Sequence, residues 1–113
     1  MSDLKYEDDE RIDHERAVQD LESSDPDVVA RVLYSITRYE TNTEWLEDQC
    51  LKKLISPELK VRWAAAVCLG VMALYRRPLD LKKVIPALEA AAQDPTISAH
   101  ANDSLSMVRE FLT

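Results

Sequence analysis

The side chains that most often bind metals or act as nucleophiles are few in this chain. It contains two histidines, His14 and His100, and two cysteines, Cys50 and Cys68. Zinc sites usually take four such ligands in closely spaced pairs, and these four residues lack that spacing. We expect both histidines to be solvated, and the apolar surroundings of the cysteines favour buried free thiols. The sequence therefore predicts no metal site.

Patterns typical of catalytic sites are also missing from the sequence. With one glycine, Gly70, the chain has no P-loop, no dinucleotide-binding fingerprint and no nucleophile elbow. The acidic pairs Asp8-Asp9 and Glu47-Asp48 are adjacent in sequence, and adjacent helical residues point in different directions. They are therefore not expected to converge on one substrate atom. We expect no catalytic residue, no cofactor and no enzymatic activity.

Charge is distributed unevenly along the chain, whose net charge is −7. Residues 1–48 contain 15 acidic and 5 basic residues, a net charge of −10, whereas residues 49–113 contain 6 acidic and 9 basic residues, a net charge of +3. An acidic half repels nucleic acid and attracts basic proteins, although such charge most often only solvates a surface. Arg76-Arg77 and Lys82-Lys83 offer an alternative phosphate-binding edge. The negative total favours the simpler interpretation that these cations are exposed helix ends, and we expect no nucleic-acid partner.

A turn containing proline, followed by three apolar residues spaced four apart, occurs three times. The turns are Asp25-Pro26, Ser56-Pro57 and Asp94-Pro95, and the apolar residues that follow begin at positions 28, 61 and 97. These positions lie 33 and 36 residues apart. Self-similarity at such a period is typical of stacked helix pairs. The sequence predicts a single all-α domain over residues 1–113, an α-solenoid of about three helix pairs, with residues 1–11 expected to fray.

Apolar periodicity places the helices near residues 12–23, 27–40, 44–55, 58–75, 79–92 and 96–112. The helix over 58–75 is apolar almost all round, which predicts a place in the middle of the stack. Thr43 is the candidate N-cap of the third helix, and Pro86 is expected to kink or split the fifth. No segment has the roughly 20 apolar residues that span a bilayer, and the acidic N-terminus lacks the apolar region of a secretory signal. We therefore expect a cytoplasmic protein without a membrane partner.

Residues 61–70, VRWAAAVCLG, resemble the second helix of a HEAT-type repeat, which favours V-R-x-x-A-x-x-x-L-G after a D/S-P turn. Residues 84–88, VIPAL, with the turn Asp94-Pro95 resemble the first helix of that repeat and its inter-helix turn. The resemblance covers roughly residues 15–112. The period is shorter than the roughly 40–47 residues of longer HEAT repeats, and Ser98 replaces the usual arginine of the third repeat. The resemblance implies an α-α superhelix whose second helices line a concave, partner-binding face.

Small HEAT-like chains include bacterial immunity proteins and antitoxins, to which this chain is similar in size, acidity and lack of a catalytic site. The resemblance implies a non-enzymatic, monomeric binding module that neutralises a basic toxin, with a nuclease as one candidate, by covering its active surface. Two alternatives remain open at this point. One is a structural adaptor or scaffold, and the other is a lyase-like HEAT chaperone, since HEAT-like repeats occur in bilin lyases.

Residues not used for stacking the helices are the candidate partner contacts. The acidic ones would meet basic groups of the toxin, and Trp, Tyr and Arg are favoured as interface anchors. Trp45 is expected in the core, whereas the sequence leaves open whether Trp63 is core or interface. The candidate contacts are Asp8, Asp9, Glu10, Arg31, Arg38, Tyr39, Glu44, Glu47, Asp48 and Trp63.

Overall fold

A computed structural model describes residues 12–113 and, within that range, contains six α-helices and no strand. The predicted contacts Asp8, Asp9 and Glu10 and the predicted frayed segment 1–11 lie outside the described residues. The all-α prediction is confirmed, and the predicted helix bounds hold to within two residues, except that the first helix ends three residues earlier than predicted. The helices are α1 (His14–Asp20), α2 (Pro26–Tyr39), α3 (Thr43–Lys53), α4 (Leu59–Leu74), α5 (Leu81–Ala91) and α6 (Ser98–Leu112).

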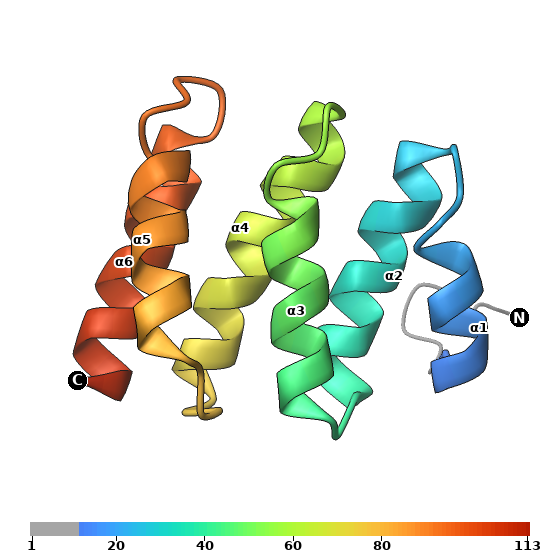
Figure 1. The fold of residues 1–113 in the computed structure, drawn as a ribbon, viewed down its shortest axis with the longest axis horizontal. Coiled ribbons are helices and arrows are strands. Elements are labelled where there is room, and N and C mark those ends of the chain that lie inside the picture. The colour runs from blue at the N-terminus through green and yellow to red at the C-terminus, as the bar shows by residue number, and fades with distance from the viewer. Residues whose placement is uncertain (1–11) are drawn as a thin grey trace, which may run out of the picture.

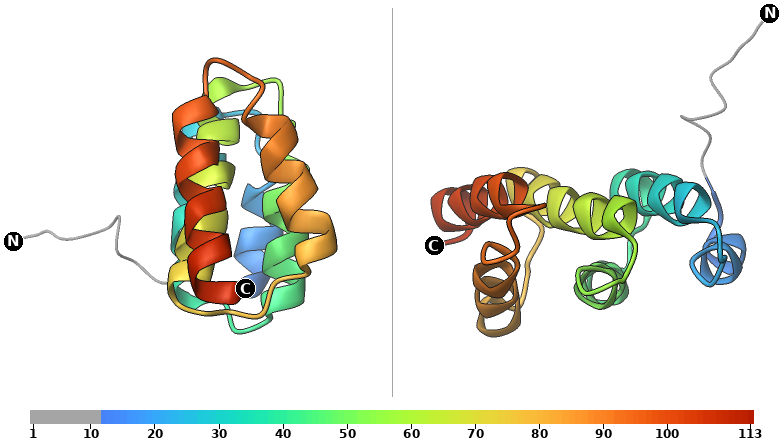
Figure 2. Two further views of the ribbon diagram at one scale, coloured as in Figure 1. Left: turned by 90° about the vertical axis from the view of Figure 1, so that its left-hand side faces the viewer. Right: turned by 90° about the horizontal axis from the view of Figure 1, so that it is seen from above.

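The helices alternate between two layers (Figures 1 and 2). Seen from above, α2, α4 and α6 lie side by side in one row, and α1, α3 and α5 lie in the other. Helix α4 packs against α2, α3, α5 and α6, and nine of its residues are buried. This position explains why the helix is apolar almost all round, and it confirms the prediction that this segment lies in the middle.

Local capping chemistry sets the helix starts. Asp25 caps α2 by accepting a hydrogen bond from the backbone N–H of Asp27 at 2.9 Å, and Pro26 is the first helical residue. The predicted N-cap Thr43 is wrong, because Asn42 caps α3 by accepting from the backbone N–H of Trp45 at 3.0 Å. Thr43 is instead the first residue of α3.

Pro86 lies inside α5, which is a single helix over Leu81–Ala91, so the predicted split is wrong. A proline at this position deprives only the Lys82 carbonyl of its intrahelical donor. Pro86 is also exposed, on the side of α5 away from its buried residues. The remaining hydrogen bonds of α5 and its buried Val84 and Leu88 keep the helix continuous.

Helices α4 and α6 approach each other closely at Gly70. Gly70 faces Ser104, and a Cβ atom added at Gly70 would lie 2.4 Å from the Ser104 hydroxyl oxygen. That hydroxyl donates a hydrogen bond of 2.6 Å to the carbonyl of Ala66. The one glycine of the chain therefore serves close helix approach.

The two cysteines are buried free thiols, as predicted. A hydrogen bond with Cys68, together with burial, raises the pKa of the Cys50 thiol well above its ordinary value. Cys50 therefore stays a neutral thiol that packs as a small apolar side chain.

Candidate protein-binding surfaces

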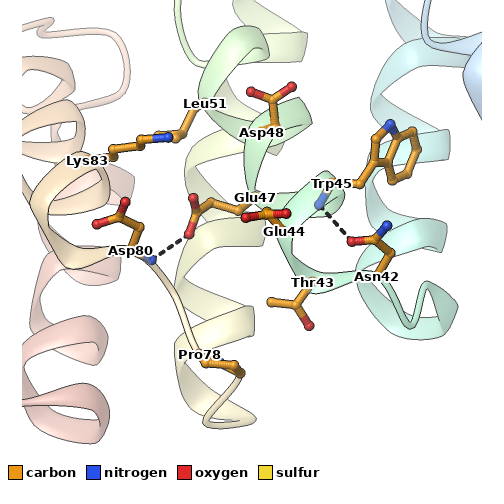
Figure 3. A pocket seen from close by; sticks show the side chains of 10 residues that line it. All are labelled: Asn42, Thr43, Glu44, Trp45, Glu47, Asp48, Leu51, Pro78, Asp80 and Lys83. Atoms are coloured by element: carbon orange, nitrogen blue, oxygen red, sulfur yellow. Dashed lines mark hydrogen bonds between the residues drawn. The ribbon is translucent and has the colours of Figure 1, made fainter.

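Three of the predicted acidic contacts lie together at one cavity, here called the acidic cavity, beside the first turns of α3 and α5 (Figure 3). Its volume is about 590 Å³. The predicted Glu44, Glu47 and Asp48 line it from α3, and Asp80, the N-cap of α5, faces them from the loop that follows α4. The full lining is Asn42, Thr43, Glu44, Trp45, Glu47, Asp48, Leu51, Pro78, Asp80 and Lys83.

Glu47 is the buried carboxylate of this cavity. The residue is 6% exposed, and its Oε1 accepts a hydrogen bond of 2.6 Å from the backbone N–H of Asp80. This bond ties α3 to the start of α5, so Glu47 is part of the fold as well as of the cavity, a role that its sequence position did not indicate. Among residues 12–113 no cation lies within ion-pair distance of Glu47.

The remaining charged groups of the acidic cavity are exposed. Glu44 lies in the first turn of α3, where the partial positive charge of the helix N-terminus favours a carboxylate. Asp48 pairs with Lys52 at 3.2 Å, but both side chains are more than half exposed, so this pair contributes little to stability. Lys83 is the one cation of the lining, and it forms no ion pair with the described carboxylates.

A second, apolar cavity of about 290 Å³ continues the acidic cavity along α3 and α5. Leu51, in the last turn of α3, lines both cavities, so they meet there. Its apolar lining includes Leu54, Ile55 and Ala87, with the exposed Ile55 side chain at its rim, and the ion pair between Arg62 and Asp94 also lines it. Helices α3 and α5 both pack on α4, which lies in the other layer behind them (Figures 1 and 2). We call the two cavities together the α3–α5 groove.

A third cavity, of about 420 Å³, lies on the opposite layer between α2 and α4. The predicted residues Arg31 and Trp63 line it together with Tyr34, and we call these three residues the aromatic surface. Trp63 is 44% exposed and stacks on His100 of α6, with ring centroids 4.6 Å apart and an angle of 22° between the planes. Trp63 is therefore a surface residue, and His100 is half-buried against it rather than solvated as predicted.

Charged groups at the rim of the aromatic surface are already paired. Lys60 of α4 donates to the carboxylate of Asp27, and this hydrogen bond lowers the pKa of Asp27 below its ordinary value. Both side chains are more than half exposed, so the pair orients the rim and contributes little to folding. The aromatic surface therefore offers aromatic area and, beyond the paired Lys60 and Asp27, the one positive charge of the Arg31 guanidinium.

Two predicted contacts lie apart from both surfaces. Arg38 and Tyr39 are at the end of α2, where the Arg38 guanidinium carbon lies 5.6 Å from the centre of the Tyr39 ring. Neither residue lines the acidic cavity or the cavity of the aromatic surface. The structure therefore does not join them to the other predicted contacts.

Two further polar clusters join the helix pairs and were missed in the sequence. Arg77, from the loop after α4, donates to the Thr43 hydroxyl at 2.9 Å and to the carbonyls of Thr37 and Glu40. His14 of α1 contacts the Glu40 carboxylate through its Nδ1 at 3.0 Å, and its ring lies 4.3 Å from that of Trp45. Trp45 is half-buried against the core, close to its predicted place.

The described residues offer no metal centre and no membrane span. Over residues 12–113, no group of three or more His, Cys, Asp or Glu side chains is arranged to hold a metal ion. None of the helices in that range combines the length and apolar composition needed to cross a membrane. What these residues do offer is the α3–α5 groove and the aromatic surface, on opposite layers.

Comparison with known proteins gives one structural match. No protein-family model and no curated protein matches the chain. Its fold is similar to that of a chain in the crystal structure of a CDI complex from Cupriavidus taiwanensis LMG 19424, with a TM-score of 0.84. The match covers 97% of this chain and 99% of that chain at 24% sequence identity. The two chains therefore share a fold over nearly their whole lengths.

Proposed function

We propose that this chain is a protein-binding module that acts as an immunity protein, neutralising a basic toxin by covering its active surface. The observation that carries this proposal is the fold that the chain shares with a member of a CDI complex over nearly its whole length. CDI denotes contact-dependent inhibition, which is consistent with an immunity protein that binds a toxin. The net charge of −7 supports a basic partner.

The two-layered helix arrangement supports a finer description of the fold. Three proline-containing turns each precede a helix of the α2–α4–α6 layer, and each helix of that layer follows one from the other layer. We infer an α-solenoid of three HEAT-like helix pairs, a class that serves binding through its surface. We further propose that the protein is bacterial, cytoplasmic, monomeric in isolation and without enzymatic activity.

Co-expression tests this proposal. The toxin domain is taken from the gene immediately upstream of the gene for this chain and expressed alone or with the chain in a test host. We expect growth arrest by the toxin alone, full growth when this chain is present, and co-purification of the two proteins. Continued growth arrest with the chain well expressed, together with no complex, would reject the immunity function.

A further inference from the structure

The buried carboxylate of the α3–α5 groove lacks the cation that such a group normally has. Glu47 is 6% exposed, yet its one hydrogen bond comes from a neutral backbone N–H, that of Asp80. Burying a charge is costly unless it is paired. The Oε2 atom of Glu47 accepts no hydrogen bond from any described residue, and it is not among the fully buried atoms. This oxygen is therefore open to the acidic cavity, toward which the side chain points (Figure 3).

The surroundings of Glu47 favour a cation from a partner. Glu44, Asp48 and Asp80 add three carboxylates to the lining, against the single ammonium of Lys83. These groups lie at the N-terminal ends of α3 and α5, while the apolar cavity lies toward their C-terminal ends. The groove is therefore negative at one end and apolar at the other.

The apolar end supplies a second, independent binding feature. Ile55 is 83% exposed, which is more than any other large apolar side chain of residues 12–113. An exposed isoleucine beside a cavity lined by Leu51, Leu54 and Ala87 is a typical anchor point for apolar side chains of a partner. Since α3 has 11 residues, the groove is roughly 16 Å long, enough for about three turns of a helix.

We propose that the α3–α5 groove binds one amphipathic, basic segment of the toxin. A lysine or arginine of that segment enters the acidic cavity and pairs with Glu47, while its following apolar side chains cover Ile55 and the apolar cavity. This inference rests on the proposed immunity function and names its docking site. The aromatic surface on the other layer then lies outside the primary contact.

Glu47→Gln tests the charge without disturbing the fold. Glutamine keeps an oxygen that accepts the Asp80 N–H, so the midpoint of thermal unfolding should not fall. Affinity for the purified toxin domain, measured by titration calorimetry, should fall at least about tenfold, because a desolvated charge pair is lost. Glu110→Gln is the matched control, since it removes the same charge from an exposed position of α6, and it should bind like the wild type.

Ile55→Ser tests the apolar end, and because the side chain is so exposed we expect this substitution to leave the fold unchanged. We expect a loss of affinity of about fivefold to tenfold. If Glu47→Gln and Ile55→Ser both bind like the wild type while Trp63→Ala abolishes binding, the groove is the wrong surface and the immunity function stands. If the wild-type chain neither binds nor protects, the immunity function fails as well.

The same variants distinguish the proposed toxin segment from two other candidate occupants of the groove. Concentration-dependent dimerisation of the isolated chain that Ile55→Ser removes would assign the groove to a second copy. Binding of Mg²⁺ or Ca²⁺ alone that Glu47→Gln removes would assign the acidic cavity to a cation. Either result would overturn the proposed toxin segment.

Discussion

Arg76 and Arg77 are neighbours in sequence, but they serve the fold in different ways. Arg76 takes a positive φ of 59° and ends α4, with its guanidinium carbon 5.4 Å from the centre of the Phe111 ring. Arg77 reaches across to the end of α2 and the start of α3. The sequence shows only a pair of cations at a helix end, whereas the structure gives the second one several acceptors.

Replacing Arg77 by alanine should lower the free energy of unfolding by about 2–3 kcal/mol, since hydrogen bonds from a charged donor are lost and carbonyls at the end of α2 lose their partner. Urea denaturation at neutral pH measures the change. Arg76→Gly is the control, because relief of the positive φ offsets the lost ring contact, and it should change stability by less than about 1 kcal/mol. Equal losses in the two variants would contradict this assignment.

Gly70 gives a second prediction at the scale of a single residue. In an open helix, Gly→Ala stabilises by roughly 0.8–1 kcal/mol. Here the new Cβ would lie 2.4 Å from the Ser104 hydroxyl oxygen and 3.1 Å from the Ser104 Cα, so we expect Gly70→Ala to destabilise by about 1–3 kcal/mol. The midpoint of thermal unfolding shows whether Gly70→Ala lowers or raises the stability.

The partner of Gly70 provides the internal control. Ser104→Ala removes the nearest atom, so the double variant Gly70→Ala/Ser104→Ala should lose less stability than the two single losses added together. A stabilising effect of Gly70→Ala in the wild-type background would show that α6 moves away at little cost.

At the scale of the helices, the turn between α2 and α3 joins three elements through Glu40. Its carboxylate accepts from the Asn42 N–H at 2.9 Å and contacts His14 of α1 at 3.0 Å. Partial burial alone would raise the pKa of Glu40, but the bonds from His14 and Asn42 outweigh it and lower the pKa. The ionised form of Glu40 therefore stabilises the docking of α1 on α2.

This lowered pKa predicts a pH dependence with a definite sign. The contribution of Glu40 is fully present above its ordinary pKa of about 4.5 and is lost as the pH falls through the lower pKa of the folded state. As the pH falls from neutral to below about 4.5, the free energy of unfolding of Glu40→Gln should therefore decrease less than that of the wild type. Urea denaturation over this range measures both profiles, and parallel profiles would count against the role of Glu40.

The helices could be predicted from the sequence because their determinants are local. The apolar spacing of α2 and the cap Asp25-Pro26 act within one or two turns of the chain. The polar contacts between helix pairs could not be predicted, because the residues that form them are distant in sequence. Glu47 contacts a backbone N–H 33 residues away, and Arg77 a carbonyl 40 residues away.

At the scale of the whole molecule, only the part of the candidate site that one helix carries could be predicted from the sequence. Glu44, Glu47 and Asp48 come together because one helix carries all three, but the sequence did not indicate that Asp80 would face them from another helix pair. The groove itself depends on α3 and α5 both packing on α4, which lies in the other layer. Such a surface follows from the spacing of helices, which no short segment of the sequence specifies.

The uneven charge of the whole chain leads to a prediction about association kinetics. Residues 1–48 have a net charge of −10, which should steer a basic toxin toward the first half of the chain, including α3. We expect the association rate with the upstream toxin domain to fall about tenfold or more as ionic strength rises from about 0.01 M to about 0.15 M. The dissociation rate should change much less, because apolar contacts hold the formed complex. Stopped-flow fluorescence at several salt concentrations separates the two rates.

Variants within the acidic cavity decide whether this steering is local. Glu44→Gln/Asp48→Asn, which neutralises two exposed carboxylates, should flatten the salt dependence of the association rate, while Ile55→Ser should leave that dependence unchanged and speed dissociation. This division follows from range, since charges act over a Debye length of about 8 Å at physiological salt and apolar contacts act only when the surfaces touch. An association rate that does not respond to salt would remove the steering role of the acidic half and leave binding to the apolar contacts alone.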